Sequence, residues 1–169
     1  MRLFVPKIYQ KDIFSINYQK LKEQGIKLLI FDLDNTIGSI KENYIKDREK
    51  ELLSSLKEDF ILVVASNSKK ERVSRFLENS NIEYFSFSLK PTLKVLFKLK
   101  KKYNIAYQDM AIIGDQIMTD IFMGNRLNLT TILVDPIINI DFKITSLNRK
   151  LEKIMMKKNK IIRGSYYEK

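Results

Sequence analysis

Short apolar runs alternate with helical patterns along this chain, and this alternation constrains the fold more than any other feature. The strongest runs span Lys27 to Leu33, Phe60 to Ala65 and Met110 to Ile113, and a last one spans Thr130 to Val134. Continuous apolar runs of this length are typical of strands that are buried on both faces, as in a parallel sheet. A weaker strand is expected near Tyr84 to Phe87.

Helical periodicity fills the stretches between these runs. Apolar residues recur on one helical face in Asp47 to Lys57, in about Lys69 to Glu78 and in Thr92 to Tyr103. Strand and helix in alternation predict an α/β fold, a three-layer α/β/α sandwich with a central parallel sheet. The length of 169 residues fits one domain, residues 1–169.

Polar residues stand where the apolar runs end. Asp32 and Asp34 close the first run, Ser66 follows the second, Asp115 follows the third, and Lys90 lies in the loop after Phe87. Ligands of open parallel sheets bind in the crevice at the carboxyl ends of the strands. These side chains are therefore expected to meet at one site.

Two absences narrow the chemistry of that site. The chain has no cysteine and no histidine, which excludes thiolate metal sites, histidine-ligated zinc and Ser-His-Asp triads. Acid–base chemistry near neutral pH then falls to carboxylates, lysine or tyrosine.

The aspartates suit phosphoryl transfer. Asp32 can attack phosphorus only if a cation holds both its carboxylate and the phosphoryl oxygens, because two anions otherwise repel. Asp115 can supply a second carboxylate for Mg²⁺, and the backbone carbonyl of Asp34 can complete the protein ligands. The Asp34 carboxyl, two residues beyond the nucleophile, can protonate the leaving oxygen and later deprotonate water. Lys90 offers positive charge to the transferring group, and Ser66 offers a hydrogen bond.

The order and spacing of these residues resemble motifs I to IV of the haloacid dehalogenase superfamily. The matching segments are Asp32-x-Asp34-x-Thr36, Ser66 after an apolar strand, Lys90-Pro91, and the run from Gly114 to Asp120. Within the superfamily the chain is similar to subclass IIIA, YqeG-type phosphatases, a group similar to phosphatidylglycerophosphate phosphatases.

The resemblance implies a Rossmann-like phosphatase fold and a Mg²⁺-dependent phosphomonoester hydrolase that works through an aspartyl-phosphate. It implies catalytic roles for Asp32, Asp34, Ser66 and Lys90. It further implies metal ligation by Asp32, Asp34 and Asp115, support from Asp120, and substrate binding by Thr36, Ser66, Asn67 and Lys90.

Each motif also has a plain structural interpretation. Asp32 and Asp34 can form an ordinary polar turn, Ser66 can cap a helix, Lys90 can be a solvated surface residue, and Asp120 can begin a surface helix. The four motifs in register favour the catalytic interpretation.

The spacing leaves no room for a lid domain. Only Ile37 to Asp59 follows the first motif, and Lys69 to Leu89 holds one helix and one strand. A capless fold and an open site are expected, which suits a bulky substrate. One candidate is a lipid headgroup such as phosphatidylglycerophosphate. The alternatives are nucleic-acid ends, soluble phosphometabolites, or an RNA- or ribonucleoprotein-binding module on a phosphatase fold.

The formal net charge of +11 is concentrated at the two ends. Residues 1–27 hold 6 basic and 2 acidic side chains, residues 143–169 hold 9 and 2, and residues 28–142 hold 16 of each sign. Basic extensions at 1–24 and 143–169 predict an anionic partner, either membrane lipid or nucleic acid, although a coding bias towards lysine explains them equally well. Apolar residues from Leu3 to Leu21 offer membrane contact or pack on the body. No transmembrane run occurs, so a cytoplasmic protein is expected, with peripheral binding at the inner membrane face as one option.

Overall fold

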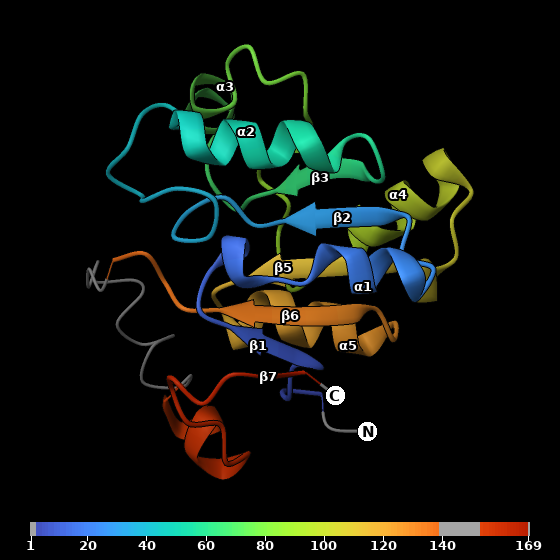
Figure 1. Cartoon of the computed structure of the whole chain (residues 1–169), viewed down its shortest axis with the longest axis vertical. Coiled ribbons are helices and arrows are strands. Elements are labelled where there is room, and N and C mark those ends of the chain that lie inside the picture. Colours follow the sequence, from blue (N-terminus) through green and yellow to red (C-terminus); the bar gives the residue numbers. More distant parts are fainter. Residues whose placement is uncertain (1–2, 139–152, 169) are drawn as a thin grey trace.

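A seven-stranded sheet forms the centre of the molecule in the computed structural model, which describes residues 3–138 and 153–168 (Figure 1). The strands are β1 (Ile8–Gln10), β2 (Leu28–Phe31), β3 (Ile61–Ala65), β4 (Glu83–Phe85), β5 (Met110–Gly114), β6 (Thr130–Val134) and β7 (Tyr167–Glu168). Their spatial order is β4-β3-β2-β5-β6-β1-β7. Neighbouring strands from β4 to β1 pair in parallel, and β7 pairs with β1 antiparallel.

Helices cover both faces of this sheet. They are α1 (Tyr18–Glu23), α2 (Asp47–Leu56), α3 (Lys70–Phe76), α4 (Lys94–Tyr103) and α5 (Phe122–Arg126), with short turns η1 (Ile13–Ser15), η2 (Tyr107–Asp109) and η3 (Ile117–Ile121). Since successive strand residues point to opposite faces, each strand feeds two cores. Leu29 and Phe31 of β2 lie in the core with α1, α2 and α3. Leu28 and Ile30 lie in the core with α4 and α5.

The predicted α/β sandwich with a central parallel sheet is confirmed, and all five predicted strands and three predicted helices are present within a few residues of their expected bounds. Among the described strands, β7 at the edge of the sheet is the exception to the predicted parallel pairing, because it pairs antiparallel with β1. Strand β1 and helix α1 were not predicted. Each is short, and Ile8-Tyr9-Gln10 has no apolar run to mark it.

The apolar residues of the N-terminal segment face the protein interior. Ile13, Ile16 and Leu21 are buried in the core, and the ring of Phe4 stacks on Phe122 with 4.8 Å between centroids. Of the two alternatives for this segment, packing on the body is confirmed for Ile13, Ile16 and Leu21. Their burial removes apolar area from water, which already stabilises the fold.

Leu147, Leu151, Ile154 and Met155 recur at helical spacing with lysines between them, which predicts a basic amphipathic helix from Ser146 to Lys158, and its residues 146–152 lie outside the described residues. Residues 153–158 are helical, and there Met156 is buried, while Ile154 of the predicted apolar face is exposed. Met156 and Ile161 pack near Tyr9 in a third apolar cluster. Among the described residues no helix combines the length and apolar character needed to cross a membrane.

Candidate active site

The inner strand β2, between β3 and β5, brings Asp32 to the sheet's carboxyl edge. Phe31 pairs with Val64 of β3 on one side and with Ile113 of β5 on the other. The Asp32 N–H continues this ladder and donates to the Ile113 carbonyl at 2.8 Å. Residues that follow β2, β3 and β5 are therefore held side by side by backbone hydrogen bonds.

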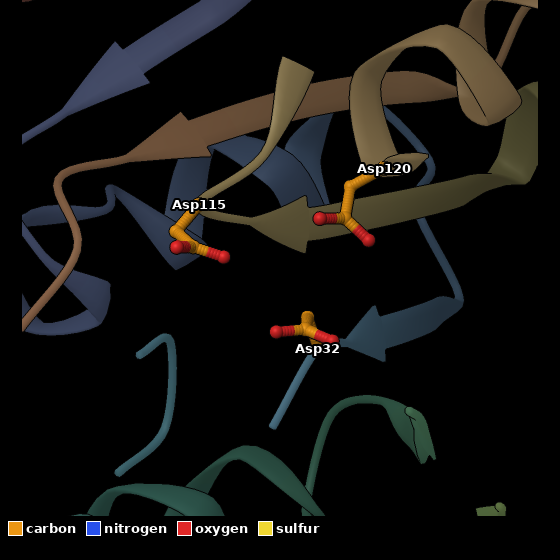
Figure 2. A group of neighbouring side chains, drawn as sticks. All are labelled: Asp32, Asp115 and Asp120. Atoms are coloured by element: carbon orange, nitrogen blue, oxygen red, sulfur yellow. The ribbon is translucent and has the colours of Figure 1, made fainter. Parts of the chain in front are cut away.

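Three buried carboxylates gather at this edge. Oxygens of Asp32, Asp115 and Asp120 lie within 4.8 Å of one another, and Figure 2 shows these side chains beside the ends of β2 and β5. Their residues are only 7%, 5% and 1% exposed. Buried carboxylates at this spacing repel unless cations neutralise them, and oxygen-only ligands suit Mg²⁺. The cluster is thus a candidate metal centre.

Lys90 is the cation that the structure places among these acids. Its ammonium group donates to Asp32 Oδ1 and, at 2.7 Å, to Asp120 Oδ1. Burial alone would lower the pKa of Lys90, but the two carboxylates outweigh burial and raise that pKa above its ordinary value. Lys90 is therefore a permanent positive charge in the site and not a surface lysine.

For the pKa of Asp32, in contrast, the effect of burial outweighs that of the neighbouring positive charge. Burial raises the pKa of Asp32 to about 7, because Lys90 offsets only part of the desolvation and the nearby Asp120 adds to the rise. A nucleophilic carboxylate needs to be ionised, so this position gains from a further cation beside it.

Asp120 reaches the cluster from the turn η3, where the backbone forms a π-helical bond from the Ile121 N–H to the Gln116 carbonyl at 3.4 Å. Such wide turns frequently occur at functional sites. Gly114, at the end of β5, makes room for this side chain, because a Cβ at that position would overlap the Asp120 carboxyl group. Asp120 is buried, so it does not begin a surface helix.

Asp34 lies outside the carboxylate cluster and has its own partners. The Ser68 hydroxyl donates to Asp34 Oδ2 at 2.5 Å, and Arg72 donates to Asp34 Oδ1 at 2.9 Å. Ser68 and Arg72 were not predicted as site residues. Ser68 precedes the N-cap of α3 and Arg72 lies in its first turn, so the available signal was their position directly after β3, at the same edge of the sheet.

The remaining predicted residues lie close by with different contacts. The Thr36 hydroxyl donates to Asp32 Oδ2 at 3.4 Å. Ser66 is 1% exposed at the end of β3, and its hydroxyl accepts the Ser68 N–H at 3.1 Å. Ser66 thus supports the turn that presents Ser68 to Asp34.

Asn67 holds the Lys90 loop. Its side-chain oxygen accepts the Lys90 N–H at 2.8 Å, and its amide donates to the Lys90 carbonyl at 3.1 Å. The Ser88 hydroxyl also donates to this oxygen, at 3.1 Å. These contacts give Asn67 a positioning role for Lys90, and its predicted contact with substrate stays a prediction.

Comparison with known proteins places this geometry in context. The family described as mitochondrial PGP phosphatase matches residues 1–138. The probable phosphatase YqeG of Bacillus subtilis (strain 168) is 35% identical over 153 residues, which cover 90% of this chain and 89% of that protein. The phosphatidylglycerophosphate phosphatase 1 of Arabidopsis thaliana, chloroplastic/mitochondrial, is 26% identical over 147 residues, covering 80% of this chain but 42% of that protein.

Solved structures share the fold at low sequence identity. A predicted HAD-like family hydrolase from Porphyromonas gingivalis superposes with a TM-score of 0.54 at 14% identity, over 75% of this chain and 98% of that one. The HAD family enzyme BT-2542 from Bacteroides thetaiotaomicron, in complex with magnesium and inorganic phosphate, gives 0.53 at 13% identity, over 72% and 99%.

Proposed function

This chain belongs to the PGP phosphatase family and is a phosphatase of the haloacid dehalogenase type, and on that premise we propose that Asp32 is its nucleophile. One observation carries the proposal. Asp32 is buried at the end of the inner strand β2, in contact with Lys90 and grouped with Asp115 and Asp120. A carboxylate in that position can attack phosphorus in line, and the surrounding cation offsets the repulsion between the two anions.

Magnesium fits the carboxylate cluster. Asp32 and Asp115 would hold the ion, with the Asp34 carbonyl as a third protein ligand and Asp120 beside them. When bound, Mg²⁺ supplies positive charge to the phosphoryl oxygens and to the nucleophile. Lys90 donates to Asp32 and Asp120, and its positive charge together with that of a divalent ion would balance the three carboxylates.

The reaction then proceeds in two displacements. An Asp32 oxygen forms a bond to phosphorus while the bond from phosphorus to the leaving oxygen breaks, and Asp34 gives that oxygen its proton. Asp34 then takes a proton from water, whose oxygen attacks the phosphorus of the aspartyl-phosphate and releases phosphate from Asp32. In the structure Ser68 and Arg72 donate to the two oxygens of Asp34, so one of these hydrogen bonds has to open before Asp34 passes a proton to the leaving oxygen.

Replacement of the nucleophile tests this assignment. Asp32→Asn should lower Mg²⁺-dependent turnover of an aryl phosphate by roughly 10³-fold or more, because the amide is a poor nucleophile and cannot form the acyl-phosphate. Asp59→Asn is the control, because Asp59 is an exposed acid paired with Lys22 away from the site, and it should keep wild-type turnover. Wild-type turnover by Asp32→Asn at unchanged thermal stability would refute the proposal.

For the substrate we propose a lipid phosphate of the phosphatidylglycerophosphate class. Among the described residues no lid domain is inserted, since the chain between β2 and β3 holds only α2 and the chain between β3 and β4 holds only α3. An open edge admits a phosphate that projects from a large object. The Arabidopsis relative carries that substrate in its name.

A comparison of substrates separates this proposal from its alternatives. Phosphatidylglycerophosphate in mixed micelles should give a kcat/KM at least about tenfold above those of nucleotides, sugar phosphates and an aryl phosphate, a difference of about 1.4 kcal/mol in transition-state binding. A phosphorylated nucleic-acid end or a soluble phosphometabolite that reacts faster would replace the lipid as substrate.

A further inference from the structure

The loop that carries Lys90 presents two large apolar side chains to solvent. In this loop, between β4 and α4, Ser88 and Lys90 point inward and are each 7% exposed. Phe87 and Leu89 alternate with them and are 57% and 53% exposed. The two exposed side chains therefore precede the lysine of the active site in the same loop.

The backbone at both residues adopts a conformation that bulky side chains disfavour. Phe87 has a φ of 45° and Leu89 a φ of 54°, in the left-handed region where a Cβ meets the backbone. Among the described residues, eight other than glycine have positive φ, and five of these are asparagine, the residue that best tolerates it. Phenylalanine and leucine in this conformation cost local free energy, and such residues cluster at functional sites.

Hydrogen bonds fix this loop in place. The Phe87 N–H donates to the Ser68 carbonyl at 3.1 Å, the Ser88 N–H to the Ser66 carbonyl at 3.0 Å, and the Thr92 N–H to the Leu89 carbonyl at 2.8 Å. With the Asn67 contacts to Lys90, these bonds hold the two apolar side chains outward. Phe87 and Leu89 are therefore preorganised for a partner, and burying their side chains on binding costs little further conformational entropy.

The same edge of the molecule is basic. Exposed lysines stand in the loop after β2, at the start of α3 and at the start of α4, namely Lys41, Lys69, Lys70 and Lys94. Of the nearby acids, Glu42 is paired with Lys46, and Glu71 is exposed. Exposed apolar side chains with lysines on neighbouring loops of the same edge match a surface with negative headgroups over a hydrocarbon interior.

We propose that Phe87 and Leu89 anchor the active-site edge on an anionic lipid bilayer. The two side chains enter the interfacial region, and the lysines of this edge lie against the headgroups. Lys90 and Asp32 then face the membrane surface, where a lipid phosphate can enter the open site. This inference rests on the proposed lipid-phosphate substrate, but binding to a membrane can be measured without turnover.

Vesicle binding by a double variant tests the anchor. Phe87→Asn combined with Leu89→Asn removes both apolar groups and suits the left-handed backbone, so the fold and the Lys90 loop should persist. Binding to vesicles of phosphatidylglycerol and phosphatidylcholine, measured by flotation, should weaken at least about tenfold, or about 1.4 kcal/mol. Binding of the wild type should also fall on vesicles of phosphatidylcholine alone. The control Ile162→Asn removes an apolar side chain that is 67% exposed in the segment before β7, the strand farthest from β4 in the sheet order, and it should bind as the wild type does.

Two further measurements make the outcome decisive. The double variant should hydrolyse a soluble aryl phosphate at the wild-type rate, and Asp32→Asn should bind vesicles as the wild type does. Vesicle binding by the double variant equal to that of the wild type would overturn the anchor, whatever the substrate. If the wild type is a dimer that does not bind vesicles, and the double variant is a monomer, this surface is an interface with a second copy and the membrane anchor is overturned as well. Loss of lipid hydrolysis with vesicle binding intact would count against the proposed substrate alone.

Discussion

At the scale of single residues, the charge of the site depends on one buried lysine between two buried aspartates. Lys90 contacts Asp32 and Asp120, and Asn67 fixes the backbone from which it projects. A buried ion pair of this kind gives little net stability, because desolvation cancels much of the attraction. Its value is geometric, since it holds Asp32 beside the space that a phosphoryl group and a metal ion would share.

Gly114 is the residue whose small size makes this geometry possible. A Cβ at Gly114 would overlap the Asp120 carboxyl group, so Gly114→Ala should displace Asp120 from Lys90. A displacement of about 1 Å in such a site is expected to lower kcat by about 100-fold, and the added methyl group to cost about 1–3 kcal/mol of unfolding free energy. Aryl phosphate kinetics and denaturant unfolding measure the two effects.

A matched control separates crowding from catalysis. A Cβ at Gly124 would also crowd its neighbours, the core side chains of Ile112 and Thr131, which lie away from the carboxylates. Gly124→Ala should therefore lose a similar unfolding free energy but keep wild-type kcat. An unchanged kcat in Gly114→Ala would show that Asp120 tolerates displacement.

At the scale of elements, the segments buried on both faces could be predicted from the sequence, and those defined by pairing could not. Strands β2, β3 and β5 are apolar on both faces, so their sequences mark them. Strand β1 and the two-residue β7 take their structure from pairing with each other and with β6, which no local pattern records. A short strand at an edge is therefore found only when its neighbours are known.

The candidate site likewise has residues whose place could be predicted from the sequence and contacts that could not. Asp32, Asp34, Ser66 and Asp115 follow predicted strands, and parallel pairing alone brings their loops to one edge. The contacts of Asp34 with Ser68 and Arg72 depend on the orientation of α3 about its axis. The hydrogen bonds between Asn67 and Lys90 depend on the path of the loop after β4. Spacing in the sequence does not determine side-chain direction in such loops.

At the scale of the whole molecule, Asp135 joins the two ends of the chain to the sheet. It follows β6, and its carboxylate accepts the hydroxyls of Tyr9 at 2.5 Å and Tyr166 at 2.8 Å. Arg163 donates to the same carboxylate at 2.9 Å. Tyr9 lies in β1, so both basic ends are tied to the body through one acid.

The hydrogen bond between Tyr9 and Asp135 makes the unfolding free energy depend on pH in the alkaline range. Burial raises the pKa of Tyr9 above its ordinary value, and the hydrogen bond to Asp135 raises it further. In the unfolded chain the phenol ionises near pH 10, whereas in the folded chain it keeps its proton to higher pH. The contribution to stability is thus complete below about pH 10 and is lost as pH rises towards the folded pKa, by at most about 1.4 kcal/mol per pH unit for one group.

Tyr9→Phe should reveal this contribution. At pH 7 the variant should lose about 1 kcal/mol of unfolding free energy with the hydrogen bond, and its unfolding free energy should fall less steeply above pH 10 than that of the wild type. Denaturant unfolding at a series of pH values measures both quantities. Tyr44→Phe is the control, because Tyr44 is 61% exposed, and it should follow the wild-type curve. Identical alkaline slopes for Tyr9→Phe and the wild type would mean that the two ends of the chain are not held to the sheet through the Tyr9 hydroxyl.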